Sequence, residues 1–127
     1  MELERIIAPA APQPTGPFVH AVRVGALLYT SGQAGRDPAT GQMGDVGAQV
    51  DQALTNLGDI AAAAGTSLHR AVKVTLILRD DVTDMAAVND AYARHFEGHL
   101  PARTSFFVSR LKNPDMLVEI EAVLDVE

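Results

Sequence analysis

The sequence predicts an α+β fold in which two helices pack on one face of a mixed sheet of about six strands. Two observations lead to this prediction. Apolar residues alternate with period two near both ends and in the middle of the chain, and they recur at three- and four-residue steps in two segments between. The elements follow the order β-ββ-α-β-α-ββ. The 127 residues fit a single domain, residues 1–127, which needs no disulfide or metal to hold it together.

The N-terminal part reads as three strands interrupted by a proline-rich arm. Residues 3–8 form a first candidate strand, and residues 8–17 contain four prolines, too many for a helix or a central strand. A hairpin is expected over residues 18–33, with Gly25-Ala26 as its two-residue turn. It ends at Ser31-Gly32, where a glycine lets a ligand or another backbone approach closely.

The middle of the chain changes to helical spacing twice. One helix is expected between Asp45 as N-cap and Gly65, and another from residue 83 or 84 to residue 98. Between them, AVKVTLILR at 71–79 alternates in polarity and is rich in β-branched residues. This segment therefore predicts a central strand.

The closing segment, residues 101–123, reads as two strands joined by a short polar turn, and we expect a hairpin. Side-chain alternation gives it one apolar face and one face that collects Arg103, Ser105, Glu119 and Glu121 among apolar neighbours. A regular hairpin places Arg103 and Glu119 roughly 13 Å apart along the strands. That separation is too large for a salt bridge and suits the two ends of a small-ligand site.

Arg103 and Glu119 are the strongest candidates for chemistry. A guanidinium binds a carboxylate through two parallel hydrogen bonds, and a glutamate in a partly apolar place can act as a general base toward water. The residues alone leave an ordinary edge-strand charge pattern as the commoner explanation. Ser31 and Ser105 are candidate hydrogen-bond donors, whereas Asn89, from its helix position alone, reads as a solvated flank residue.

The uncovered face of the sheet predicts self-association. Two helices can cover one face of a six-stranded sheet, and the opposite face is expected to carry apolar side chains. The alternation assigns to it Thr75, Ile77, Phe107, Leu117 and Val123. An exposed patch of this kind usually marks an interface, so we expect a homo-oligomer.

Composition excludes several classes of protein. The net charge of −6 argues against a protein that binds nucleic-acid backbones, and the lack of cysteine excludes disulfides, thiolate zinc sites and a cysteine nucleophile. The N-terminus lacks the pattern of a signal peptide, and no apolar run is long enough for a membrane span, so a soluble cytoplasmic protein is expected. His95 and His99 are four residues apart, but Gly98 interrupts the helix, so no metal site is predicted. His20 and His69 are expected at the surface.

Segments along nearly the whole chain match one known pattern. They are GPFVHAV at 16–22, YTSGQ at 29–33, DVGAQVDQALTNL at 45–57, AVKVTLIL at 71–78, VNDAYARHF at 88–96, and PARTSFFVSRL with VEIEAV near the end. The P-A-R segment followed by E-I-E-A is the most specific part. With these motifs the chain resembles the RidA/YjgF family of reactive-intermediate (enamine/imine) deaminases. The resemblance implies a chorismate-mutase-like α+β fold and a homotrimer with a ligand pocket at each subunit interface.

The resemblance also implies roles for individual residues. Arg103 would hold the carboxylate of a 2-imino or 2-enamino acid, and Glu119 would activate the water that attacks the imine carbon. The products are a 2-keto acid and ammonia. The reaction would remove reactive, damaging metabolites. Ser31, Gly32 and Asn89 match further pocket positions of the family. No cofactor is implied, because a protonated imine is already electrophilic and needs only orientation and charge placement.

Two positions depart from the family pattern. Phe18 stands where the best-known members have tyrosine, and Ser105 stands where many have cysteine. Both match pocket positions, so they bear on substrate choice more than on the type of reaction. We expect a weaker preference for the smallest substrate, 2-aminoacrylate, and tolerance of imines from larger apolar amino acids.

Three other functions stay open from the sequence. The chain could be a family deaminase in a catabolic pathway, acting for example on an aminomuconate-type acid. It could also be a non-catalytic, chaperone-like trimeric module that binds small carboxylates. The third is a ribonuclease, against which the acidic balance and the lack of a basic, aromatic-rich face argue.

Overall fold

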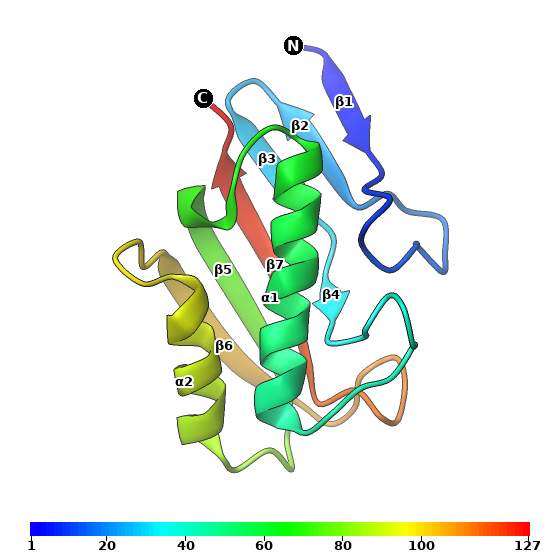
Figure 1. Cartoon of the computed structure of the whole chain (residues 1–127), viewed down its shortest axis with the longest axis vertical. Coiled ribbons are helices and arrows are strands. Elements are labelled where there is room, and N and C mark those ends of the chain that lie inside the picture. Colours follow the sequence, from blue (N-terminus) through cyan, green and yellow to red (C-terminus); the bar gives the residue numbers. More distant parts are fainter.

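The computed structural model describes all 127 residues and contains two α-helices and a seven-stranded sheet (Figure 1). The helices are α1 (Val46–Ala63) and α2 (Met85–His95), and a 3₁₀ turn, η1 (Leu68–Arg70), follows α1. The strands are β1 (Leu3–Ile6), β2 (Ala21–Val24), β3 (Leu27–Thr30), β4 (Gln33–Ala34), β5 (Ala71–Arg79), β6 (Ala102–Val108) and β7 (Val118–Asp125). The predicted α+β class and both helices are confirmed, and the short β4 is the strand that the sequence did not predict.

The strand order in the sheet corrects the prediction for the closing segment. The order is β1-β2-β3-β7-β5-β6, with β4 also paired to β7. β5 pairs in parallel with β6 and antiparallel with β7, so β5 separates the two strands that were expected to form a hairpin. The hairpin over residues 101–123 is therefore wrong. The physical reason is that α2 crosses over between β5 and β6, which returns the chain parallel to β5.

Both helices pack on the same face of the sheet, and the core lies between them and the sheet (Figure 1). The carboxylate of Asp45 accepts a hydrogen bond from the N–H of Ala48 at 2.9 Å, which caps α1. Asp84 caps α2 in the same way through Ala87 at 3.0 Å. Gly65 has a φ of 83°, which lets the chain turn away after α1. Neither helix is long and apolar enough to cross a membrane.

The register across β6, β5 and β7 determines which face each candidate residue occupies. Directly paired residues on neighbouring strands lie on the same face of a sheet. Val74 pairs with both Arg103 and Ala122, and Val74 and Ala122 are buried under the helices. Arg103 therefore lies on the face that the helices cover. Glu119 pairs with Ile77 and lies on the opposite, open face.

The predicted common face for Arg103, Ser105, Glu119 and Glu121 is therefore wrong. The two strands use opposite parities, because Leu76 pairs with Ser105 on one side and with Ile120 on the other. The same register moves Phe107 to the helix side and places Phe106, paired with Ile77, on the open face.

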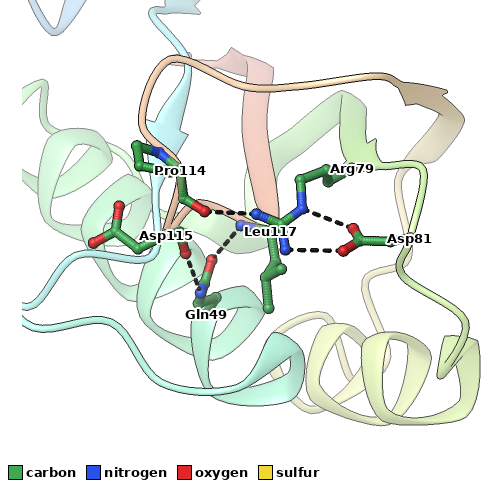
Figure 2. Close-up of polar contacts among 6 residues, drawn as sticks. All are labelled: Gln49, Arg79, Asp81, Pro114, Asp115 and Leu117. Carbon is green, nitrogen blue, oxygen red and sulfur yellow. Dashed lines mark hydrogen bonds and ion pairs between the residues drawn. The ribbon is translucent and has the colours of Figure 1, made fainter.

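The loop between β6 and β7, which leads directly into Glu119, is firmly held (Figure 2). The side-chain amide of Gln49 donates to the carbonyls of Gly44 and Asp115, at 2.9 and 3.0 Å, and accepts from the N–H of Leu117 at 2.8 Å. Arg79 donates to the carbonyl of Pro114 at 2.6 Å. These contacts tie the loop to α1 and β5.

Candidate functional site

Glu119 lines a surface pocket between the proline-rich arm, the segment around β4 and the β6–β7 loop. Phe18 and Gly32, two further predicted site residues, line the same pocket. The other residues around it are mostly polar or proline, namely Pro12, Gln13, Pro14, Thr15, His20, Gln33, Ala34, Arg36, Lys112, Asn113 and Met116. The structure therefore brings three of the seven predicted site residues together.

The side chain of Glu119 occupies space that exists because residue 32 is glycine. A Cβ atom at this position would lie 2.5 Å from Oε2 of Glu119, closer than any real contact. Burial is the main cause that raises the pKa of the Glu119 carboxyl, and the neighbouring Glu121 raises it further, whereas Lys112 lowers it. A carboxylate with a raised pKa is a stronger base than an ordinary one, which suits it to accept a proton from water.

Ser31 is not among the residues that line this pocket. Its Oγ donates to the carbonyl of Val19 at 2.6 Å, and its N–H donates to the carbonyl of His20 at 2.9 Å. In the single chain, Ser31 therefore fixes the arm next to Phe18 instead of pointing at a ligand.

His20 is a residue whose position the sequence did not predict. It was expected at the surface, but it is fully buried. Its Nδ1 accepts from the N–H of Ala8 at 2.8 Å, and its Nε2 lies 2.7 Å from the carbonyl of Pro12, so the ring is neutral with its hydrogen on Nε2. His20 thereby holds the proline-rich arm that forms one wall of the pocket. A lone histidine after the arm gives no sequence signal for this role.

Arg103 lies elsewhere, on β6 and facing α2. Its Nη2 donates to Oδ1 of Asn89 at 3.0 Å, and its Cζ lies 4.7 Å from the centre of the Tyr92 ring. The structure therefore brings Asn89 and Arg103 together, and it makes Asn89 more than a solvated flank residue. Ser105 is exposed two residues further along β6, on the same face as Arg103. No carboxylate forms a salt bridge with Arg103.

The predicted site residues thus form two groups. We call Phe18, Ser31, Gly32 and Glu119 the glutamate group, and Asn89, Arg103 and Ser105 the arginine group. Arg103 and Glu119 are two strands and three residues apart in register, so their Cα atoms are about 14 Å apart. Their side chains also lie on opposite faces of the sheet. Within one chain, the two groups cannot contact the same small molecule.

The open face of the sheet carries apolar side chains beside Glu119 and Glu121. Ile77 and Val123 are half-buried, and Phe106 and Tyr29 are 44% and 48% exposed. The register places all four on this face. The face predicted to be uncovered is therefore confirmed as apolar, although Phe106 replaces Phe107 in it.

The histidines do not form a metal site. His95 contacts the carboxylate of Asp51 at 2.7 Å, whereas His99 stacks on His69 with ring centres 4.4 Å apart. No group of three or more histidine, aspartate or glutamate side chains is arranged to hold a metal ion.

Comparison with known proteins identifies the family of the chain. Residues 8–126 match the family model described as Endoribonuclease L-PSP. The 2-iminobutanoate/2-iminopropanoate deaminase of Capra hircus is 44% identical over 124 residues, which cover 95% of this chain and 89% of that protein. The crystal structure of the YjgF gene product of E. coli superimposes with a TM-score of 0.90 at 38% identity, covering 98% of this chain and 99% of that one.

A further solved structure, E. coli TdcF with bound serine, superimposes with a TM-score of 0.89 at 35% identity. It covers 96% of this chain and 98% of that chain. Matches in sequence and in structure thus extend over nearly the whole length, with both helices and the sheet included. The chain belongs to the RidA/YjgF family.

Proposed function

We propose that this protein is an enzyme that hydrolyses 2-imino and 2-enamino acids to 2-keto acids and ammonia. The main supporting observation is the pair of groups described above. One offers a partly desolvated carboxylate beside Gly32, and the other offers a guanidinium that no carboxylate of the chain neutralises. The name of the goat relative, a deaminase of 2-iminobutanoate and 2-iminopropanoate, agrees with this chemistry.

Each group has a distinct part in the reaction. Arg103 holds the substrate carboxylate through paired hydrogen bonds, which fixes the position of the neighbouring imine carbon. Glu119 accepts a proton from water while the water oxygen bonds to that carbon, and the proton passes to the nitrogen. The carbinolamine then collapses: the hydroxyl proton passes by way of Glu119 to the nitrogen, the C–N bond breaks, the nitrogen leaves as ammonia, and the oxygen becomes the keto group. The raised pKa of Glu119 supports the proton transfer.

The proposal includes a homotrimer in which each active site forms between two subunits. The glutamate group of one subunit meets the arginine group of the next, because neither group can reach the other within a chain. The apolar open face beside Glu119 supports this arrangement, since burial against a second copy removes Phe106 and Tyr29 from water. A repeated head-to-tail contact of this kind closes a ring when the rotation between neighbours divides a full turn evenly, as the proposed trimer requires.

Mixing two inactive variants tests this arrangement. Arg103→Ala removes the guanidinium from every site, and Glu119→Gln removes the base, so each variant alone is expected to be inactive. In mixed oligomers made by co-refolding equal amounts, about a quarter of the interfaces combine an intact arginine group with an intact glutamate group. Ammonia release from imines generated in place by an amino-acid oxidase should therefore return to about a quarter of the wild-type rate.

The double variant Arg103→Ala/Glu119→Gln is the matched control. Mixed with either single variant, it should restore nothing, because one of the two groups is then absent from every interface. No recovery in the mixture of single variants would refute the inter-subunit site. Wild-type protein that releases no ammonia or keto acid from any imino acid would instead refute the deaminase and favour a binding module.

Substrate choice distinguishes general removal of imines from a single catabolic step. The test measures kcat/KM for a panel of imino acids of different length that includes an aminomuconate-type acid. Similar values for several short and apolar imines support general removal, and a large preference for the aminomuconate-type acid supports the catabolic role.

A further inference from the structure

Two side chains of α2 contact the guanidinium of Arg103. Asn89 and Tyr92 are three residues apart in the helix, so they lie on the same face. Asn89 accepts a hydrogen bond from Nη2 at 3.0 Å, and the guanidinium carbon lies over the Tyr92 ring, 4.7 Å from its centre. The hydrogen bond holds one edge of the guanidinium, and the ring lies against the guanidinium carbon.

These contacts leave most of the guanidinium free to bind a ligand. A guanidinium has five N–H donors, and Asn89 accepts from one of them. Arg103 forms no salt bridge with any carboxylate of the chain, and its side chain is only half-buried. Donors therefore remain for a carboxylate that approaches from the side away from Asn89.

The ring of Tyr92, and not its hydroxyl, makes the contact with Arg103. Tyr92 is 5% exposed and packs on Phe96, with ring centres 4.7 Å apart. Its hydroxyl is buried and has no hydrogen-bond partner. Burial raises the pKa of this hydroxyl to about 12, although Arg103 lowers it, so the group stays protonated. A buried hydroxyl without a hydrogen-bond partner lowers stability, so the favourable contacts of Tyr92 are those of its ring.

We infer that Tyr92 is a positioning residue that holds the Arg103 guanidinium for the carboxylate of the substrate. This inference rests on the proposed function, in which Arg103 binds that carboxylate. The negative face of an aromatic ring attracts a cation, and a held guanidinium loses less freedom when it binds. Holding one long side chain in place in advance strengthens ligand binding by roughly 2- to 13-fold.

The test compares Tyr92→Leu, which removes the ring, with Tyr92→Phe, which removes only the hydroxyl. Tyr92→Leu should raise KM roughly 2- to 13-fold and leave kcat within about twofold, because the substrate carboxylate is bound equally before and during the reaction. Tyr92→Phe should keep the wild-type KM, with a Tm no lower than wild type, because it removes the hydroxyl that has no partner.

Val88→Ala is the control for a general loss of packing in α2. Val88 is fully buried on the same helix and takes no part in the hydrogen bond or the ring contact with Arg103, so this variant should lower Tm without changing KM. If Tyr92→Phe raises KM as much as Tyr92→Leu, the hydroxyl matters and the inference is wrong. If Tyr92→Leu behaves like Val88→Ala, with a lower Tm and the wild-type KM, the role of Tyr92 is only structural.

Binding of pyruvate, a 2-keto acid that cannot be deaminated, separates this inference from the proposed function. The dissociation constant of pyruvate, measured by calorimetry on the wild type and on each Tyr92 variant, should follow KM. A wild type without deaminase activity whose pyruvate binding is still weakened by Tyr92→Leu would refute the function and support the positioning of Arg103. An unchanged dissociation constant in Tyr92→Leu would refute the positioning.

Discussion

Two glycines on either side of β4 should respond in opposite ways to a single added methyl group. Gly32 approaches the side chain of Glu119, and Gly35 approaches the backbone of α1 at Gln49. Neither has a positive φ, so alanine is sterically allowed by the backbone at both positions. A comparison of the two alanine variants therefore reports only on the atoms that each glycine approaches.

At Gly32, the added Cβ would lie 2.5 Å from Oε2 of Glu119, about 0.9 Å short of ordinary contact at 3.4 Å. The end of a glutamate side chain can rotate away, so Gly32→Ala should cost less than about 1 kcal/mol of unfolding free energy. A displacement of about 1 Å at a reacting group can nevertheless lower the rate by about 100-fold. We therefore expect a folded protein with kcat/KM lowered by about two orders of magnitude.

At Gly35, the added Cβ would lie 2.3 Å from the carbonyl oxygen and 2.4 Å from the Cα of Gln49. A helix backbone cannot rotate away, so the helix or the strand must shift. Overpacking of this kind costs about 1–3 kcal/mol or more, and we expect Gly35→Ala to lower the stability far more than Gly32→Ala.

Urea unfolding and steady-state ammonia release measure the two effects separately. The pH dependence of the residual activity of Gly32→Ala adds a third test. If the methyl group pushes Glu119 toward solvent, burial no longer raises its pKa, and the acidic limb of the profile should move to lower pH. Full activity in Gly32→Ala, or an equal loss of stability in both variants, would refute this reasoning.

Three further predictions follow from the contacts around Glu119 and the β6–β7 loop. In Glu119→Gln, activity should vanish while urea unfolding at pH 7 shows higher stability. The reason is that burial raises the pKa of Glu119 in the folded state, so the wild type loses stability as pH rises through that pKa. A less stable Glu119→Gln variant would contradict this. In Lys112→Met, the acidic limb of the kcat/KM profile should move to higher pH, because Lys112 lowers the pKa of Glu119. The control, Lys112→Arg, should keep the wild-type profile. An unmoved limb in Lys112→Met would count against an effect of Lys112 on the Glu119 pKa. In Gln49→Ala, the unfolding free energy should fall by about 1–3 kcal/mol, because the loop loses its hydrogen bonds to Gln49 at Asp115 and Leu117 and the chain before α1 loses the one at Gly44. Gln52→Ala, whose amide bonds only to Asn56, is the control, and equal stability of the two variants would argue against the anchoring role.

The helices and the central strand could be predicted from the sequence because their signals are local. Asp45 and Asp84 cap helices whose apolar stripes recur at helical spacing, and the alternation in residues 71–79 describes β5. Each of these signals depends on neighbours within a few residues, so no knowledge of the rest of the fold is needed.

The pairing of the last two strands could not be predicted from local signals, because it depends on the order of the elements along the chain. Residues 71–108 form a strand, a helix and a strand, and this pattern favours parallel pairing of the two strands through a crossover. The alternation in β6 and β7 gave the parity within each strand, but the face that each parity occupies depends on the strand beside it. Once β5 lies between them, Arg103 and Glu119 fall on opposite faces.

The contacts that complete the candidate site come from residues far apart in the chain. His20 fixes the arm through the backbone of Ala8 and Pro12, and Tyr92 supports Arg103 from α2. No local pattern in the sequence shows which cation the ring of Tyr92 contacts. The residues themselves indicated Arg103 and Glu119, the resemblance to a family added Phe18 and Asn89, and only the structure shows that the site residues form two groups.

The place of β7 in the sheet has a consequence for how the protein is made. β7 is the last strand in the sequence, yet it lies between β3 and β5 and pairs with both. During synthesis, β3 and β5 therefore have exposed inner edges until the residues up to Asp125 leave the ribosome. Contacts between such distant segments are slow to form, and open strand edges invite association with other chains. This protein should depend on chaperones during translation more than its small size suggests, and loss of β7 should prevent folding of the whole sheet.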